Sequence, residues 1–312
     1  MSETIDHVAT QTYEDIDVTD WTIVGDEVLG TKPKRWLRHP ETGEHWLMKD
    51  ATYSHRNDGT RYRKGDDWSE RVANGVAARL GLPAARTELA SSRTSEAHKL
   101  GVISRSVLAT SQGDNVKEVL IPGNQLLAEP ATGRDRSTYT PATIRDALEG
   151  VHVPDGVDAG LTAWDVFAGY LVLDAVVGNT DRHEENWAVL DRAGHRCLAP
   201  TFDHASSLGF QLADEQRRDR LRTRDSGYTP EAYADRAKTH FAGRPHPIAI
   251  ARRAIEMPGT DSQSLWMDRC REVDRLVEPL WLIPEDRMSL PAREFAERVL
   301  RRNCQRLLDR HD

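Results

Sequence analysis

The pattern of apolar and polar residues divides the chain into a strand-rich first part and a helical second part. Residues 35–38 and 44–49 are short extended runs on either side of a turn-forming segment at residues 40–43. Two such runs around a polar turn with proline and glycine are typical of a β-hairpin. Residues 85–89 and 100–107 also predict strands. A small β-sheet is therefore expected early in the chain.

A helix is predicted between these strands, over residues 69–80. Apolar side chains recur at every fourth position from Trp68 to Leu80, which places them on one helical face. Aspartate and serine side chains at positions 66–69 are expected to cap its N-terminus, and Gly81 is expected to end it. The sheet is therefore expected to contain one helix inserted within its sequence.

The second part of the chain begins with a long apolar segment. Residues 163–177 are almost all apolar and too numerous for one strand, so they predict a buried helix. Residues 187–190 and 195–198 flank a short polar turn and predict a second hairpin. The preceding segment, residues 111–160, is loop-rich, with one short helix that starts at Thr140.

These elements predict an α+β protein with two lobes. About four helices are expected in residues 229–312. We assign a flexible acidic arm to residues 1–20, a small β-rich lobe to 21–110, a loop-rich connector to 111–160, and a larger, mainly helical lobe to 161–312.

Composition narrows the class of protein. The 312 residues are 38% hydrophobic and 29% charged, which is ordinary for a globular enzyme. The net charge of −8 gives no basic footprint for nucleic acid, and neither a membrane-spanning run nor a signal peptide is evident. Cys197, Cys270 and Cys304 are scattered, which argues against a disulfide framework or a zinc site. We therefore expect a cytoplasmic enzyme without direct nucleic-acid or membrane contacts.

The strongest chemical signal lies directly after the predicted buried helix. Asp181 precedes Asn186 by five positions, and Asp203 follows after the predicted hairpin. Phosphoryl transfer needs a carboxylate that orients or deprotonates the attacking hydroxyl, and oxygen ligands that hold Mg²⁺ on nucleotide phosphates. We therefore predict that Asp181 and His183 are the catalytic residues and that Asn186 and Asp203 bind the metal. Two roles stay open for His183, which are contact with the substrate and hydrogen bonding that positions the loop.

Candidates for phosphate contact lie just before the first hairpin. Gly30 lets the backbone approach phosphate oxygens, and Thr31, Lys32 and Lys34 surround it with polar and positive groups. The segment is not a Walker A motif, because GxxxxGK[ST] occurs nowhere in the sequence. We predict that these four residues contribute to an ATP-binding loop.

Lys49 and Glu70 are the other predicted nucleotide-binding residues. Strand alternation places Lys49 on the face opposite Trp46 and Met48, toward the expected nucleotide. Glu70, in the first turn of the next helix, is placed to pair with Lys49 across the lobe. The alternative is that Glu70 only favours the dipole of its own helix.

The runs at residues 178–186 and 198–203 resemble those of the HipA-like serine/threonine kinases. This bacterial family includes toxin kinases of toxin–antitoxin pairs. The resemblance extends over about residues 28–300, and the segment that contains Gly30 looks like the phosphate loop of the family. It implies a two-lobed protein-kinase-like fold, ATP and Mg²⁺ as cofactors, and transfer to a serine or threonine hydroxyl.

The resemblance also implies partners, and it leaves alternative functions open. Toxin members modify aminoacyl-tRNA ligases and are restrained by a DNA-binding antitoxin protein, so both are candidate partners. Because the sequence starts almost directly at the kinase core, no separate antitoxin-docking domain is expected. Two other functions stay open. One is a lipid or small-molecule kinase, because phosphoinositide kinases use a similar loop, and the other is a catalytically inactive ATP-binding module.

Overall fold

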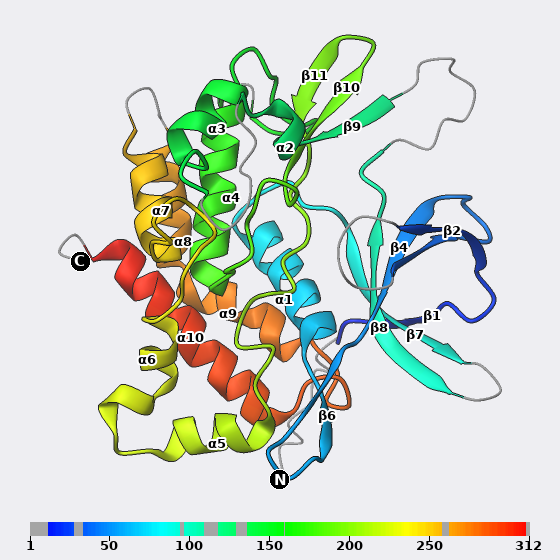
Figure 1. Cartoon of the computed structure of the whole chain (residues 1–312), viewed down its shortest axis with the longest axis vertical. Coiled ribbons are helices and arrows are strands. Elements are labelled where there is room, and N and C mark those ends of the chain that lie inside the picture. Colours follow the sequence, from blue (N-terminus) through cyan, green and yellow to red (C-terminus); the bar gives the residue numbers. More distant parts are fainter. Residues whose placement is uncertain are drawn as a thin grey trace, which may run out of the picture.

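The fold combines a β-rich lobe with a larger helical lobe (Figure 1). This confirms the predicted α+β class. The computed structural model describes residues 12–27, 34–93, 97–108, 118–128, 136–158, 160–257 and 262–309.

The β-rich lobe is built on a six-stranded sheet with the strand order β1-β7-β8-β4-β3-β2. All neighbours are antiparallel except β1 and β7. The predicted hairpin is present as β3 and β4, and the other two strand predictions are confirmed with shifted bounds. The strands of this sheet are β1 (Asp15–Asp17), β2 (Thr22–Glu27), β3 (Lys34–Arg38), β4 (His45–Asp50), β7 (Thr87–Arg93) and β8 (His98–Arg105).

Strand β4 has the alternation that the sequence predicts. Trp46 and Met48 are buried in a small apolar cluster with Leu37 and Ile103. Lys49 therefore points to the opposite face of the sheet, as side chains at odd and even positions of a strand must. This face looks toward the helical lobe.

The expectation of a loose arm through residue 20 is wrong for its last part. Asp15–Asp17 forms an edge strand that pairs in parallel with residues 89–91. Ile16 packs against the small apolar cluster beneath the sheet. A strand of three residues with charged ends carries no recognisable alternation, so the sequence pattern could not reveal it.

Helix α1 (Asp66–Arg79) confirms the predicted helix and starts three residues earlier. The predicted caps are wrong, because the N-cap is Gly65 and no side chain caps it. The Asp66 carboxylate instead accepts hydrogen bonds from the backbone N–H (3.1 Å) and the hydroxyl (2.7 Å) of Thr52. Asp66 thus ties α1 to the loop after β4.

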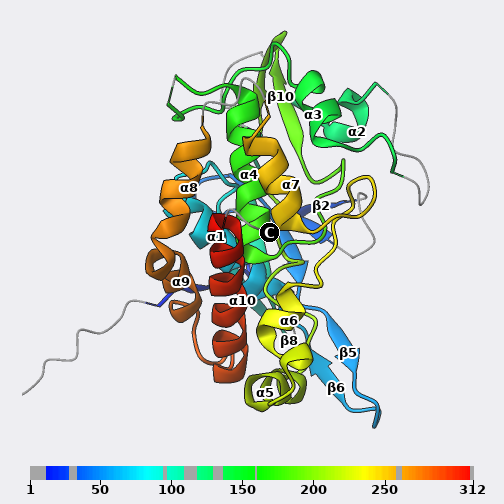
Figure 2. The same cartoon turned by 90° about the vertical axis from the view of Figure 1, so that its left-hand side faces the viewer.

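The helical lobe is arranged around α4 (Ala163–Val177), in which every residue is buried. Figure 2 shows α4 between α7, α8 and α10. None of the described helices combines the length and the apolar character needed to cross a lipid bilayer. The described part of residues 229–312 holds five helices rather than about four. The helices around and below α4 are α5 (Asp214–Arg222), α6 (Pro230–Ala234), α7 (Pro247–Ile255), α8 (Gln263–Arg271), α9 (Val273–Trp281) and α10 (Leu290–Leu308).

The connector holds more structure than its loop-rich sequence indicated. Helix α3 (Pro141–Ala147) was predicted, and Thr140 caps it. Strand β9 (Glu118–Pro122) and helix α2 (Gly123–Leu126) were not predicted. They form because β9 pairs along one edge of the second hairpin, β10 (Ala188–Arg192) and β11 (His195–Leu198). Such long-range pairing cannot be read from five residues.

The two lobes share one apolar core, to which both α1 and α4 contribute. A side chain at Gly75 of α1 would place its Cβ 2.8 Å from Cβ of Pro279 in α9, so the glycine permits close helix contact. Arg287, which precedes α10, is fully buried and pairs with Asp67 of α1 at 3.0 Å. It also donates to the Gly101 carbonyl in β8 at 2.6 Å. These contacts fix the sheet and α1 against the helical lobe.

A separate hairpin of β5 (Tyr53–His55) and β6 (Arg61–Arg63) extends from the β-rich lobe alongside α5 (Figure 1). Arg56 in its turn pairs with Glu215 of α5 at 3.0 Å. The Tyr62 hydroxyl donates to the Gln211 carbonyl at 2.8 Å. The hairpin is therefore a second bridge between the lobes.

Candidate active site

The end of α4 delivers the predicted catalytic loop. The helix stops at Gly178, which has a left-handed φ of 65°. The next side chain, Asn179, donates to the Asp174 carboxylate at 2.8 Å and accepts the Asp181 backbone N–H at 3.1 Å. The buried helix end thus fixes the backbone of Asp181, while the Asp181 side chain remains 43% exposed.

Arg182 holds the loop from inside. Its guanidinium pairs with Asp174 through two hydrogen bonds of 2.7 and 2.9 Å, and both side chains are buried. Although burial alone would lower it, the Asp174 carboxylate raises the pKa of Arg182 above its usual value. Arg182 also donates to the Asn186 carbonyl and to the Thr201 hydroxyl, the latter at 3.0 Å. It therefore joins both halves of the predicted Asp181–Asp203 motif.

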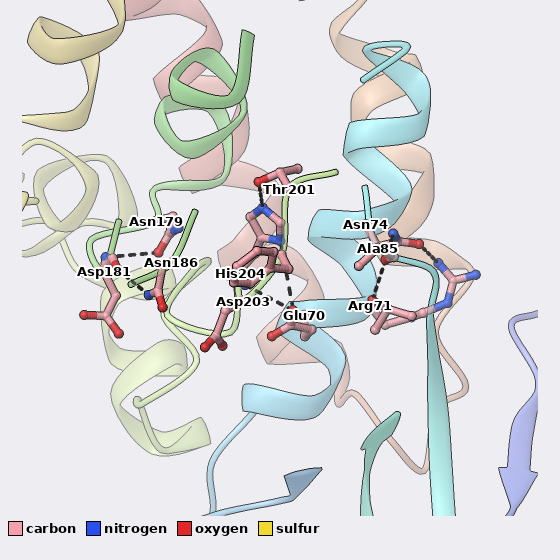
Figure 3. A network of polar contacts seen from close by, with 12 residues as sticks. Glu70, Arg71, Asn74, Ala85, Asn179, Asp181, Asn186, Thr201, Asp203 and His204 are labelled. Carbon is pink, nitrogen blue, oxygen red and sulfur yellow. Dashed lines mark hydrogen bonds and ion pairs between the residues drawn. The ribbon is translucent and has the colours of Figure 1, made fainter. Parts of the chain in front are cut away.

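Asn186, which the sequence predicts as a metal ligand, is bonded to the backbone of Asp181. Its Nδ2 donates to the Asp181 carbonyl at 2.6 Å. This bond orients the amide and leaves Oδ1 without a bond to any other residue in the described part of the chain. Figure 3 shows the Asp181, Asn186 and Asp203 side chains pointing to the same side of the site. Asn186 can therefore offer an oxygen beside the two carboxylates.

Asp203 is held between two lysines. Its Oδ1 is 2.8 Å from Lys49 Nζ and its Oδ2 is 3.7 Å from Lys34 Nζ. Although burial opposes ionisation, Lys49 and Lys34 outweigh it and hold the pKa of Asp203 well below its usual range. The residue has a φ of 62°, a left-handed conformation that is uncommon outside glycine and is concentrated at functional sites.

Lys49 connects the two lobes at this point. Its Nζ is 3.4 Å from Glu70 Oε2 in α1 and 2.8 Å from Asp203 in the helical lobe. Burial would by itself lower the pKa of Lys49, but Asp203 and Glu70 outweigh burial and raise this pKa above its usual value. The predicted pairing of Lys49 with Glu70 is thus present in the structure.

A buried histidine links Glu70 back to the catalytic loop. The backbone N–H of His204 donates to Glu70 Oε1 at 3.2 Å, and its Nε2 is 2.8 Å from the Thr201 hydroxyl. Burial, together with the charge of Arg182, lowers the pKa of His204 well below its usual value. Figure 3 shows this chain of contacts from Thr201 through His204 to Glu70. The charged groups of both lobes therefore belong to one network.

His183 has no hydrogen bond to the side chains of this network among the described residues. Its Nδ1 accepts the backbone N–H of Glu185 at 3.2 Å, which is the loop-positioning role that the sequence left open. Burial lowers the pKa of His183. Its ring packs edge-on against His240, with 5.9 Å between the ring centroids.

The start of α2 packs against the end of the loop that carries Asp181 and Asn186. Gly123 donates its N–H to the Trp187 carbonyl at 2.9 Å, and Asn124 donates to the Glu184 carbonyl at 3.0 Å. A Cβ on Gly123 would lie 2.2 Å from the Trp187 indole and 2.6 Å from the Glu184 carbonyl. Only glycine fits this contact without displacement of the loop.

The structure thus brings together Lys34, Lys49, Glu70, Asp181, Asn186 and Asp203 as predicted, with His183 beside them. Gly30, Thr31 and Lys32 lie outside the described residues. Three polar residues of the site were not predicted from the sequence: Asp174, Arg182 and His204. Their only indication in the sequence is that each is a polar residue within or next to an apolar run or a chemical motif. Polar residues of this kind are buried only when they have partners.

The residues present fit a nucleotide with Mg²⁺. An amide oxygen and a carboxylate are hard oxygen ligands of the kind that Mg²⁺ uses, with water and phosphate as its other ligands. Two lysines at the same carboxylate supply positive charge for phosphate oxygens. The Asp181 carboxylate points to the same side as the Asn186 and Asp203 side chains (Figure 3).

Two solved structures are similar to this chain in fold. The Helicobacter pylori proinflammatory kinase CtkA superposes with a TM-score of 0.65 at 17% sequence identity, over 95% of this chain and 96% of CtkA. HipA of Shewanella oneidensis MR-1, from its complex with HipB and operator DNA, has a TM-score of 0.54 at 13% identity, over 92% of this chain and 66% of HipA. These similarities show a kinase-like fold shared with HipA-type proteins.

Sequence comparison identifies the family. None of the curated protein sequences is a significant match to this chain. The profile of the HipA-like C-terminal domain matches residues 27–257, which hold every residue of the site described above. The chain therefore belongs to the family of proteins that contain a HipA-like C-terminal domain.

Proposed function

We propose that this protein is an ATP- and Mg²⁺-dependent kinase that transfers the γ-phosphoryl group to a serine or threonine hydroxyl of a protein. The observation that carries the proposal is the position of Lys49, between Glu70 of α1 and Asp203 of the helical lobe. Kinases need an ion pair between a strand lysine and a helix carboxylate, and an aspartate nearby that can hold Mg²⁺. Lys49, Glu70 and Asp203 are placed to meet both needs.

The chain's own residues account for positioning and charge. Asn186 Oδ1 and the Asp203 carboxylate would hold Mg²⁺, which when bound supplies charge neutralisation at the phosphates. Lys49 and Lys34 would hold phosphate oxygens in place. Asp181, with its backbone fixed by Asn179, would orient the acceptor hydroxyl and accept its proton.

Two kinds of partner follow from this proposal. The substrate would be a protein with a serine or threonine acceptor, an aminoacyl-tRNA ligase being the first candidate by family resemblance. The solved complex of Shewanella HipA with HipB and operator DNA supports an antitoxin protein as a second partner. Both interactions would take place in the bacterial cytoplasm.

The nucleotide part of the proposal is tested by Lys49→Met with Lys99→Met as a matched control. Lys99 is also a sheet lysine paired with a carboxylate, Asp50 at 3.1 Å, but it is 47% exposed and has no contact with Asp203. The loss of one charge-assisted contact is expected to weaken Mg²⁺–ATP binding by roughly 10- to 100-fold in Lys49→Met. Isothermal titration should show less than about a twofold change for Lys99→Met. Equal affinities of the two variants for Mg²⁺–ATP would contradict the assignment of Lys49 to the nucleotide site.

The acceptor is tested by incubation with γ-labelled ATP, Mg²⁺ and a bacterial extract, followed by phosphoamino-acid analysis. Label in phosphoserine or phosphothreonine is expected. Label confined to the lipid or small-molecule fraction would refute a protein acceptor and favour a lipid or small-molecule kinase. ATP binding with no label in any fraction would favour the inactive binding module.

A further inference from the structure

His240 touches the predicted catalytic base. It lies between α6 and α7, far from Asp181 in the sequence, yet its Nε2 is 3.0 Å from Asp181 Oδ1. The two side chains are 38% and 43% exposed, so the contact is accessible to solvent. Sequence patterns give no reason to join these two residues.

The backbone on both sides of His240 is anchored. Thr239 is buried and bonds twice to the Pro245 carbonyl, through its N–H and its hydroxyl, each at 2.9 Å. Phe241 is buried and stacks on Tyr139, with ring centroids 4.5 Å apart. The His240 ring is therefore presented from a fixed segment, not from a free loop.

The partner side is equally fixed. Asp181 has its N–H bonded to Asn179 and its carbonyl bonded to Asn186. His183 packs edge-on against the His240 ring and limits its rotation. A surface ion pair is usually weak because two long side chains must be ordered to form it. The cost of ordering is small here, because the backbones of Asp181 and His240 are already fixed and the His240 ring already packs against His183.

We propose that His240 is a positioning residue that holds Asp181 through Oδ1 and leaves Oδ2 to accept the proton of the acceptor hydroxyl. This rests on the proposed function and deepens it. Of the described residues, only His240 places a side-chain nitrogen within ion-pair distance of the Asp181 carboxylate. In the transfer, the hydroxyl oxygen forms a bond to the γ-phosphorus, the bond to the ADP oxygen breaks, and the hydroxyl proton passes to Oδ2.

The test compares steady-state transfer of label from γ-labelled ATP by the wild type, His240→Ala and His240→Gln, with His195→Ala as the control. His195 is an exposed histidine on β11 that stacks on His152. Loss of orientation at the base is expected to lower kcat by roughly 10- to 100-fold in His240→Ala, with less than about a twofold change in KM for ATP. The glutamine amide can donate from a similar position, so His240→Gln should recover most of kcat.

Each outcome decides the proposal. A His240→Ala rate equal to that of the wild type and of His195→Ala overturns the role of His240 alone. A fall caused by a raised KM for ATP, or a glutamine variant as inactive as the alanine variant, also overturns it, since neither fits a donor that orients the base. A wild type that transfers no label to any acceptor overturns the proposed function, and the inference with it.

Discussion

Replacement of Arg182 by methionine should be among the most damaging single changes outside the reacting groups. Methionine keeps much of the buried volume but removes every donor of the guanidinium. The change leaves the Asp174 carboxylate buried with Asn179 as its remaining side-chain donor. It also removes a donor from the Asn186 carbonyl and from the Thr201 hydroxyl.

The magnitude follows from burial. Arg182 and Asp174 are only 2% and 5% exposed, so loss of one partner leaves an uncompensated charge in the interior. Such losses cost about 3–5 kcal/mol, which for a chain of this size lowers Tm by roughly 5–8 °C. Arg301→Met is the matched control. Arg301 also makes paired contacts to carboxylates but is 42% exposed, and its loss should cost no more than about 1 kcal/mol.

Urea unfolding of the two variants, together with Asp174→Asn and the double variant Arg182→Met/Asp174→Asn, measures this cost. The asparagine removes the charge while its Oδ1 can still accept from Asn179. The double variant should therefore recover about 2 kcal/mol relative to Arg182→Met alone. A loss in Arg182→Met no greater than that in Arg301→Met, or no recovery in the double variant, would refute the assignment of Arg182 as the internal support of the loop.

Two further predictions follow from packing. Gly123→Ala should cost about 1–3 kcal/mol and lower any transfer activity, because its Cβ would meet the indole beneath the loop. Gly25→Ala, where a Cβ meets nothing within 4 Å, should change the unfolding free energy far less, and equal losses in urea titrations would contradict the close contact. Burial raises the pKa of Cys304 to about 12 and that of Cys270 well above its usual value, so both thiols should resist a thiol reagent near pH 8 until the protein unfolds. Cys197 is partly exposed and should react first, and rapid reaction of all three in the native state would show that the helical core opens.

The sequence predicted those parts of the fold whose signal is local. Residues 163–177 form the buried helix with the predicted bounds, because a long apolar run admits few alternatives. The strand β1 and the strand β9 were missed, since each is held by pairing with a segment distant in the sequence. The predicted caps of α1 failed for a related reason, because Asp66 found a tertiary partner in Thr52.

The site was predictable where chemistry fixes residue type and spacing. Asp181, Asn186 and Asp203 stand at intervals that a hairpin can bring together, and Lys49 is placed by strand alternation. Arg182 and His204 lie inside the same motifs, but nothing in their spacing shows that their side chains turn inward. The contact between His240 and Asp181 could not be predicted from the sequence, because it depends on how the segment between α6 and α7 packs against the loop. Spacing therefore indicates the candidate reacting groups, whereas the residues that hold them in place can be found only from packing.

The most direct test of the central claim is a single-turnover measurement of phosphoryl transfer from γ-labelled ATP with Mg²⁺ and a bacterial extract. The wild type is compared with Asp181→Asn, Asp203→Asn and the control Glu185→Gln, which removes an exposed carboxylate from the same loop. The wild type and Glu185→Gln should label the same protein bands, and both aspartate variants should lose at least about 100-fold in rate. Labelling that persists in either aspartate variant at the rate of the control would contradict the site.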